Sequence, residues 1–277
     1  MLPESKLTDM FKRSTLIIIS ALLLTQTAMA ADLQWFGQSA FKITTDSGKI
    51  VLIDPFITQN PKTPEDLKDL TALGDVSLIL VTHGHGDHMG DTAELAKLTG
   101  AKVAMNADMG LVVQALGMIP KEQLVRFNKG GPIMPVGDEI RITLTRAEHS
   151  SSIAHKDSET GIMEVHPGGE PSGFIIELIP ENKTLYHAGD TGVFGDMIFI
   201  GNYYQPDYAL LPIGGHFTMD PIHAAYAVDG LLKTPKVIPM HYGTFPPLKG
   251  TPDEFKAALR GDSEVIVMEP GQKIEIN

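Results

Sequence analysis

The chain has 277 residues, of which 43% are hydrophobic and 20% charged, a composition ordinary for a globular enzyme of one large domain or two small ones. Its formal net charge of −12 argues against a general binder of nucleic acid or anionic membranes, because both repel an acidic protein. The sequence contains no cysteine, which excludes disulfides, thiolate metal sites and a cysteine nucleophile. Any metal must therefore be held by histidine and carboxylate.

The first thirty residues have the pattern of a secretory signal peptide. Lys12 and Arg13 precede the apolar run "LIIISALLL", and Ala28 and Ala30 have the small-residue spacing that signal peptidase reads. The run is too short to span a bilayer, which needs about 20 apolar residues. An uncleaved N-terminal anchor is the alternative. We expect cleavage after about Ala30, a periplasmic or secreted protein without stable membrane insertion, and one domain over residues 31–277.

Short apolar runs along residues 31–277 predict the strands of an α/β domain. A segment between two of them, Ser150–Ser172, shows no periodicity, and we expect a long loop of the kind that forms lids or binding loops. The strands are predicted at Leu33–Phe36, Ala40–Thr44, Ile50–Ile53, Val76–Val81, Lys102–Met105, Ile140–Thr145, Gly173–Leu178, Thr184–Tyr186, Tyr208–Leu211, Val237–Met240 and Glu264–Met268.

Three helices carry start signals. Asp91 is expected to cap "TAELAKL" in a capping box with Glu94, and Gly100 to end that helix. The other two helices follow Asp220, before "PIHAAYAVDGLL", and Thr251, before "PDEFKAALR", each with proline at the first helical position.

The stretch "VTHGHGDHMGD", Val81 to Asp91, follows a predicted strand and collects potential metal ligands. Strand ends that face a cleft are where α/β folds place chemistry. Gly84 and Gly86 allow a tight turn that lets neighbouring side chains converge. A polar turn of hydrogen-bonded histidines is the alternative, but the spacing favours metal ligands. One cation cannot easily use four such groups together with ligands from elsewhere, whereas two can. The four groups are His83, His85, Asp87 and His88.

Further ligands are predicted where three later strands give way to turns, at His149, Asp190 and His241. Imidazole and carboxylate suit Zn²⁺, which we expect, and also Fe²⁺ or Mn²⁺. The proposed arrangement holds two divalent ions, with Asp190 bridging them. The first ion is bound by His83, His85 and His149, and the second by Asp87, His88 and His241.

The HxHxDH cluster and the order of the later His, Asp and His resemble the metallo-β-lactamase superfamily, and most closely its UPF0173-type, UlaG-like metal-dependent hydrolases. The resemblance implies an αββα sandwich of two mixed β-sheets flanked by helices, with the metals at one sheet edge. The sequence departs from the zinc β-lactamases that carry a cysteine in the second metal site. Asp190 instead resembles the bridging aspartate of the glyoxalase II, lactonase and phosphodiesterase branches. The matching stretches are "LQWFGQSAFKI", "VLIDPF", "VTHGHGDHMGD", "YHAGDTGVFGDM", "DYALLPIGGHFTMDP" and "VIPMHYGTFP".

This arrangement predicts a hydrolase acting on a small-molecule substrate. A water bridging two cations about 3.5–4 Å apart becomes hydroxide near neutral pH and can attack a carbonyl or phosphoryl centre. Asp87 is expected to help hold that water in line. An ester-type bond, a phosphodiester or a lactone, is the expected target. β-Lactamase, thioesterase or ribonuclease activity and a non-catalytic metal-binding protein are the alternatives, and the sequence leaves the oligomeric state open.

Other polar residues have expected supporting roles. His216, after the predicted strand "YALLP", is expected to face the cleft and to orient the substrate or act as general acid, with a packing role as the alternative. His187 is expected to support the ligands by a hydrogen bond, and Asp54 to accept the second N–H of a ligating imidazole. The apolar segment Phe194–Tyr204 indicates either an acyl or aromatic substrate or the packing of a helix.

Overall fold

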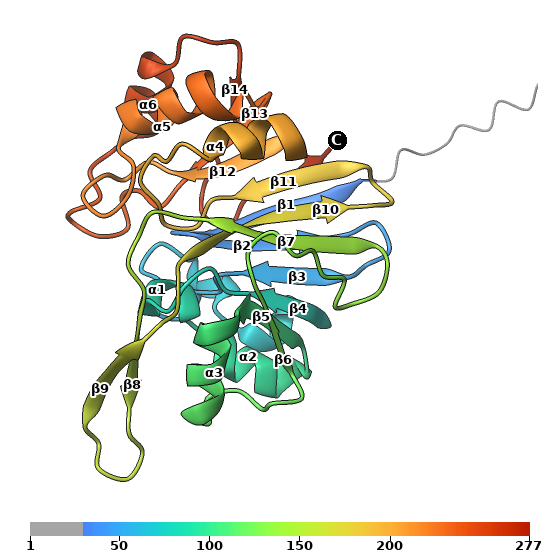
Figure 1. Ribbon diagram of the computed structural model, residues 1–277, viewed down its shortest axis with the longest axis vertical. Helices are drawn as coiled ribbons and strands as arrows, with labels where there is room; N and C mark the ends of the chain where they lie inside the picture. The colour runs from blue at the N-terminus through green and yellow to red at the C-terminus, as the bar shows by residue number, and fades with distance from the viewer. Residues whose placement is uncertain (1–29) are drawn as a thin grey trace, which may run out of the picture.

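Two large mixed β-sheets stack face to face, with helices on both outer faces, in a computed structural model that describes residues 30–277 (Figure 1). The predicted αββα sandwich is therefore confirmed. The predicted signal peptide, except for Ala30, lies outside the described residues. Within residues 30–277, none of the helices combines the length and the apolar character needed to cross a bilayer.

The first sheet has seven strands in the order β15-β1-β2-β3-β4-β5-β6. Neighbouring strands are parallel from β3 to β6 and antiparallel from β15 to β3. The strands are β1 (Ala31–Gly37), β2 (Ala40–Thr44), β3 (Ile50–Ile53), β4 (Val76–Leu80), β5 (Lys102–Asn106), β6 (Leu124–Phe127) and β15 (Lys273–Ile276).

The second sheet has six strands in the order β14-β13-β12-β11-β10-β7. The pairs from β11 to β14 are parallel, and β10 runs antiparallel to both β7 and β11, so β7 points in the same direction as β11. The strands are β7 (Ile140–Arg146), β10 (Ser172–Leu178), β11 (Lys183–His187), β12 (Tyr208–Pro212), β13 (Lys236–Met240) and β14 (Glu264–Val265).

Alternating side chains of the central strands supply two cores at once. In β12, Tyr208 and Leu210 join the core between the sheets, whereas Ala209 and Leu211 join the core beneath the outer helices. Successive side chains of a strand point to opposite faces, so a strand that is covered on both faces must be apolar throughout. This explains why the predicted strands appear in the sequence as short, uninterrupted apolar runs.

Helices cover both outer faces, and two of the predicted helix starts are confirmed. Asp220 accepts a hydrogen bond from the backbone N–H of His223, and Thr251 and Glu254 form a capping box. The helical segments are η1 (Glu65–Leu67), η2 (Leu70–Leu73), α1 (Gly86–Met89), α2 (Thr92–Thr99), α3 (Ala107–Ala115), α4 (Met197–Phe199), η3 (Ile200–Tyr204), α5 (Pro221–Tyr226), η4 (Ala227–Leu232) and α6 (Pro252–Ala258).

The predicted capping box at Asp91 is wrong. Asp91 does precede α2, and Gly100 ends that helix in the left-handed conformation as expected, but the carboxylate of Asp91 makes no capping hydrogen bond. It accepts hydrogen bonds instead from the backbone N–H groups of Ile57 and Thr58 and from the Thr58 hydroxyl. Asp91 therefore ties the segment after β3 to the start of α2.

The predicted loop Ser150–Ser172 is also wrong in part. Most of it forms a two-stranded antiparallel hairpin of β8 (Ser152–Lys156) and β9 (Met163–Pro167), which projects away from both large sheets (Figure 1). β6, β15, α3 and the short helical segments η1, η2 and α1 were also not predicted. The first two lie at the edges of the first sheet, where fewer neighbours dictate an apolar pattern.

Candidate metal centre

The segment after β4 holds four of the seven predicted ligands. His83 and His85 lie in the turn between β4 and α1, and Asp87 and His88 lie within α1. Gly84 is required here by a close approach, because a Cβ at this position would lie 2.7 Å from Ile153 Cγ1 and 2.9 Å from the Ser152 carbonyl oxygen.

The other three predicted ligands meet this segment at the same edge of the sandwich. His149 follows β7, Asp190 follows β11 and His241 follows β13, all of which run in one direction. Three triads place their potential ligand atoms within 4.8 Å of one another. They are His83, His85 and His149; His83, His88 and Asp190; and Asp87, His88 and His241. The first and last triads match the two groups predicted for the two ions.

Asp190 lies between the two groups. Its Oδ2 is 3.0 Å from Nε2 of His241 and 3.6 Å from Nε2 of His149, and its Oδ1 is 3.3 Å from Nε2 of His88. On the first side, Nε2 of His83 is 2.9 Å from Nδ1 of His85. One carboxylate thus reaches imidazoles of both groups, as a bridging ligand must.

Several of these buried atoms have no hydrogen-bond partner among the described residues. Nε2 of His88, Nε2 of His241 and Oδ1 of Asp190 all lack a hydrogen-bond partner within residues 30–277, although imidazole nitrogens and carboxylate oxygens lie close to one another. A buried polar atom without a partner costs about 1–3 kcal/mol. Because these atoms converge and are imidazole nitrogen or carboxylate oxygen, the set fits divalent cations of the zinc, manganese or iron type.

Asp54 makes the expected contact with the second ring nitrogen of a predicted ligand, and it orients two imidazoles. Its Oδ2 lies 2.7 Å from Nδ1 of His88 and accepts a hydrogen bond of 2.7 Å from the Thr82 hydroxyl. That hydroxyl lies 3.0 Å from Nδ1 of His83. Because the Thr82 proton is directed at Asp54, the hydroxyl can accept the Nδ1–H of His83. Both imidazoles then carry their proton on Nδ1 and present a bare Nε2 to a cation.

Gln38 is a functional candidate that the sequence did not indicate. It lies in the turn between β1 and β2, and its Nε2 donates a hydrogen bond of 2.8 Å to Oδ2 of Asp87. The backbone carbonyl oxygen of Gln38 accepts hydrogen bonds from the indole N–H of Trp35 and from the backbone N–H of His241. Gln38 therefore fixes one ligand by its side chain and another by its backbone.

The charges of the site reinforce one another. Burial opposes the charged form of Asp190, but His241 and His88 outweigh it and hold the pKa of Asp190 well below its ordinary value. Burial also opposes the imidazolium of His241, but Asp190 outweighs it and raises the pKa of His241 to about 9. At His83 burial dominates and lowers the pKa well below the ordinary value. The carboxylate at the centre stays ionised, as a cation ligand must.

A hollow of about 670 Å³ opens over five of the seven ligands. His216 does not line it, although we expected this residue to face the cleft. It is exposed, lines a neighbouring hollow, and follows Gly215 in a second left-handed conformation (φ 62°), while Phe217 takes the place at the metal edge. The residues of the metal hollow other than ligands are Gln38, Phe56, Gln59, Gly86, Ser150, Phe217, Phe245 and Leu248.

His187 supports the site through backbone groups. It is fully buried, its Nε2 lies 3.1 Å from the carbonyl oxygen of Ser39, and its Nδ1 accepts a hydrogen bond from the N–H of Gly189. With Nδ1 accepting, Nε2 carries the proton and donates to Ser39. His187 thus holds the turn that presents Asp190 without touching a ligand side chain. Burial is the largest cause of its lowered pKa.

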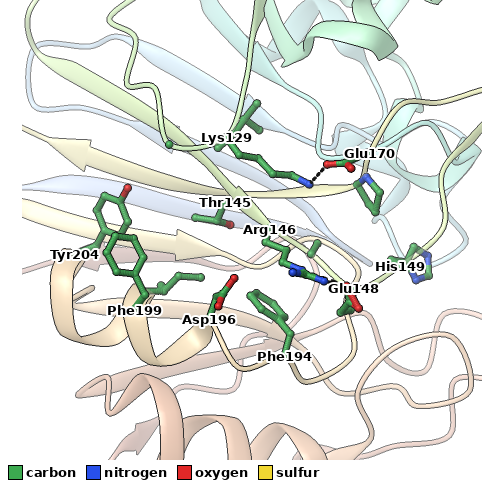
Figure 2. A pocket seen from close by; sticks show the side chains of 15 residues that line it. Lys129, Thr145, Arg146, Glu148, His149, Glu170, Phe194, Asp196, Phe199 and Tyr204 are labelled. Carbon is green, nitrogen blue, oxygen red and sulfur yellow. Dashed lines mark hydrogen bonds and ion pairs between the residues drawn. The ribbon is translucent and has the colours of Figure 1, made fainter.

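A second cavity, of about 900 Å³, shares His149 with the metal hollow. Figure 2 shows it extending along β7 from His149 to Tyr204. Phe194, Phe199 and Ile200 line it, and Phe194 and Ile200 also pack into the core beneath the outer helices, so the apolar Phe194–Tyr204 segment both packs a helix and borders a cavity. From the predicted loop, Ser150 lines the metal hollow, and Glu170 and Pro171 line this second cavity.

Known proteins are similar to this chain in sequence and fold. Residues 49–242 match the model of the β-lactamase superfamily domain family. A UPF0173 metal-dependent hydrolase of Cupriavidus necator is 51% identical over 252 residues, which cover 90% of this chain and 87% of that protein. Igni18, described as a novel metallo hydrolase of the archaeon Ignicoccus hospitalis, is 39% identical in sequence. It superposes with a TM-score of 0.76, over 90% of this chain and 99% of its own.

A more distant likeness supports the architecture alone. A metallo-β-lactamase fold protein of Bacillus subtilis is 15% identical, with a TM-score of 0.63 over 89% of this chain and 99% of that one. The arrangement of two sheets and outer helices thus persists where the sequence similarity has largely disappeared.

Proposed function

The chain belongs to the UPF0173 metal-dependent hydrolases of the β-lactamase superfamily, and from this premise we propose that it hydrolyses an ester-type bond, a phosphodiester or a lactone, with two divalent cations, zinc first among them. The observation that carries the proposal is the convergence of seven imidazole and carboxylate side chains beside an open hollow. Metal sites that serve structure alone are usually closed by four protein ligands, whereas catalytic ones leave a position for substrate.

Two cations bound here would supply an activated water and would polarise the C=O or P=O bond whose carbon or phosphorus is attacked. The chain's own residues prepare the site for them. Asp54 and Thr82 fix the ring orientation and tautomer of His83 and His88, so that both rings present Nε2. Gln38 restrains the carboxylate of Asp87, which is directed toward the hollow together with Asp190. Asp87 would therefore be the residue that holds the attacking water in line.

The choice of substrate follows from the walls of the hollow. They offer phenylalanine rings and the neutral groups of Gln38, Gln59 and Ser150, a setting suited to a small organic ester. β-Lactam and thioester hydrolysis use the same attack on a carbonyl and are the alternative activities of this site. The chain has no cysteine to complete the second metal site of the cysteine-bearing β-lactamases, which favours the ester over the β-lactam.

The test is a substrate panel on protein purified with added zinc or manganese. Bis-p-nitrophenyl phosphate, a γ-lactone and nitrocefin are assayed with the unchanged protein, with Asp87→Ala, and with His223→Ala as an exposed control remote from the ligands. We expect turnover of the lactone or the phosphodiester, loss of it in Asp87→Ala, and no effect of His223→Ala. If protein loaded with two ions turns over none of the three, the proposal fails and a metal-binding role is favoured.

We also propose that the protein acts outside the cytoplasm, because residues 1–30 have the pattern of a cleaved signal peptide. Expression of the full chain in a Gram-negative host followed by intact-mass measurement of the periplasmic fraction tests this. Mass loss corresponding to residues 1–30 supports export, and full-length protein retained in the cytoplasm contradicts it.

A further inference from the structure

The second cavity begins at the metal centre. His149 has its Nε2 3.6 Å from Oδ2 of Asp190 on one side and lines the cavity on the other. From there the lining runs back along the chain through Glu148 to Arg146 and Thr145 of β7 (Figure 2). We call this cavity the β7 groove. A substrate held at the metals would lie within reach of its near end.

The floor of the β7 groove is apolar where Ala147, Phe194 and Ile200 line it, and all three are buried. Thr145 of β7 lies beside them (Figure 2), because the neighbouring Leu144 belongs to the core between the sheets. Phe199 lies at its rim with 54% of its surface exposed, although an aromatic ring of this size is usually covered. The ring stacks on exposed Tyr203, with centroids 5.1 Å apart, and meets Tyr204 edge to face. Exposed aromatic clusters that border a cavity mark binding sites.

The charged groups of the β7 groove are largely paired with one another. Arg146 donates to Glu148 at 2.8 and 3.2 Å, and Lys129 donates to Glu170 at 2.7 Å. Asp196 adds a third carboxylate, so acidic groups outnumber basic ones. Neither lysine nor arginine lines the metal hollow within residues 30–277. Neither space therefore offers a free cation to a carboxylate or phosphate carried by the substrate.

From these observations we propose that the β7 groove is a subsite for an uncharged apolar arm, acyl or aryl, of the ester cleaved at the metal centre. This assignment rests on the proposed function for the cleavage step, and on the groove's own lining for the arm. The groove's volume of about 900 Å³ falls in the range of small-molecule sites and accommodates an arm of several carbon atoms. Apolar floor, paired charges and direct contact with His149 together define the specificity.

The first test measures chain-length dependence. kcat/KM is determined for p-nitrophenyl esters from acetate to decanoate with the zinc-loaded protein. Each added methylene is expected to raise kcat/KM about fourfold until the groove is filled. Phe199→Ala should lower kcat/KM for the octanoate by about tenfold, mainly through KM, and leave the acetate within about twofold. Tyr226→Ala, which removes an aromatic ring of similar exposure outside both cavities, should change neither.

The second test separates the groove from catalysis. Binding of octanamide, acetamide and octyltrimethylammonium to the same zinc-loaded protein is measured by calorimetry. We expect octanamide to bind at least tenfold more tightly than the other two, and Phe199→Ala to remove that preference. Octanamide binding without hydrolysis of any carboxylate ester, lactone or phosphodiester would refute the proposed function and retain the subsite. A flat chain-length profile, equal loss on all esters in Phe199→Ala, or tighter binding of the cationic ligand would overturn the subsite.

Discussion

Two glycine-bearing segments rich in histidine, Val81–Asp91 and Ser150–Ser172, have opposite fates in this structure. The first is enclosed at the edge of the sandwich, where His83 and His88 are fully buried. The second extends into solvent as the β8–β9 hairpin, on which Val165 is 71% exposed. Both follow a strand of a large sheet. What differs is the number of independent elements that hold each segment in place.

The buried segment is fixed from many directions. Asp54 after β3, Gln38 after β1 and Asp190 after β11 all contact side chains of Val81–Asp91. Among residues 30–277, the hairpin is held near its base, where Ile153 is buried against Gly84 and the Ser151 hydroxyl accepts the N–H of Gly84, and β9 lies against α3. The comparison teaches that function here depends on convergence from several strands. It also shows that the base of the hairpin packs against the segment Val81–Asp91, whereas the far end of the hairpin does not.

The largest expected effect is on the bridging position. Asp190→Asn removes the negative charge that lies among His88, His149 and His241. Metal content should fall from about two ions per chain to one or fewer, and hydrolysis should fall by more than ~100-fold. The matched change in the hairpin, Glu164→Gln, should leave both unchanged. Retention of two ions by Asp190→Asn, measured by elemental analysis, would contradict a bridging role.

The next effect concerns orientation of the ligands. Asp54→Asn keeps the size of the side chain but removes the negative charge from the group whose Oδ2 both faces Nδ1 of His88 and accepts the Thr82 hydroxyl. Metal affinity should fall about 10- to 100-fold, as measured by competition with a chelator. Asp157→Asn in the turn of the hairpin is the control. Equal affinities for Asp54→Asn and the unchanged protein would show that the Asp54–His88 contact does not tune the site.

The contact between the two segments can be tested by a pair of glycine substitutions. Gly84→Ala places a Cβ within 3.0 Å of Ser152 backbone and Ile153, and should cost about 1–3 kcal/mol of unfolding free energy. Gly86→Ala, in the same segment, meets no atom within 4 Å and should be neutral or slightly stabilising. Denaturant unfolding of both variants decides the matter. If the two variants are equally stable, the base of the hairpin is not packed against the segment Val81–Asp91.

The smallest expected effect is on the pH dependence of the unfolding free energy. The pKa of buried His187 is lowered, whereas in the unfolded chain it returns to about 6.5. Below that pH the unfolded state binds a proton that the folded state does not, so folding stability should fall as the pH drops. His187→Gln should therefore show a shallower loss of unfolding free energy between pH 7.5 and 5. A slope as steep as that of the unchanged protein would assign the dependence to other groups.

Sequence reasoning reached the seven converging residues because two local features coincided at each of them. A potential ligand follows an apolar run, and the run ends at a turn, as at Asp190 after β11. Asp54 was reached in the same way. The partners that were missed depend on long-range geometry. Gln38 reaches Asp87 from a turn between two antiparallel strands, and its sequence neighbourhood carries no metal-binding pattern.

The wrong predictions have two physical origins. Distant groups compete with local ones for a side chain, or a segment lacks a core that would impose a pattern on its sequence. Asp91 fits a helix cap, but backbone N–H groups after β3 take its carboxylate. The hairpin has little core to impose alternation, because four of the five residues of β9 are exposed. His216 follows a strand as the ligands do, but two successive left-handed residues turn it to a neighbouring hollow.

Anomalous diffraction from crystals grown with zinc tests the central claim most directly, because it locates each ion relative to named side chains. We predict two anomalous peaks about 3.5–4 Å apart, one beside His83, His85 and His149, the other beside Asp87, His88 and His241, with Asp190 between them. A single peak, or peaks remote from Asp190, would contradict a dinuclear centre.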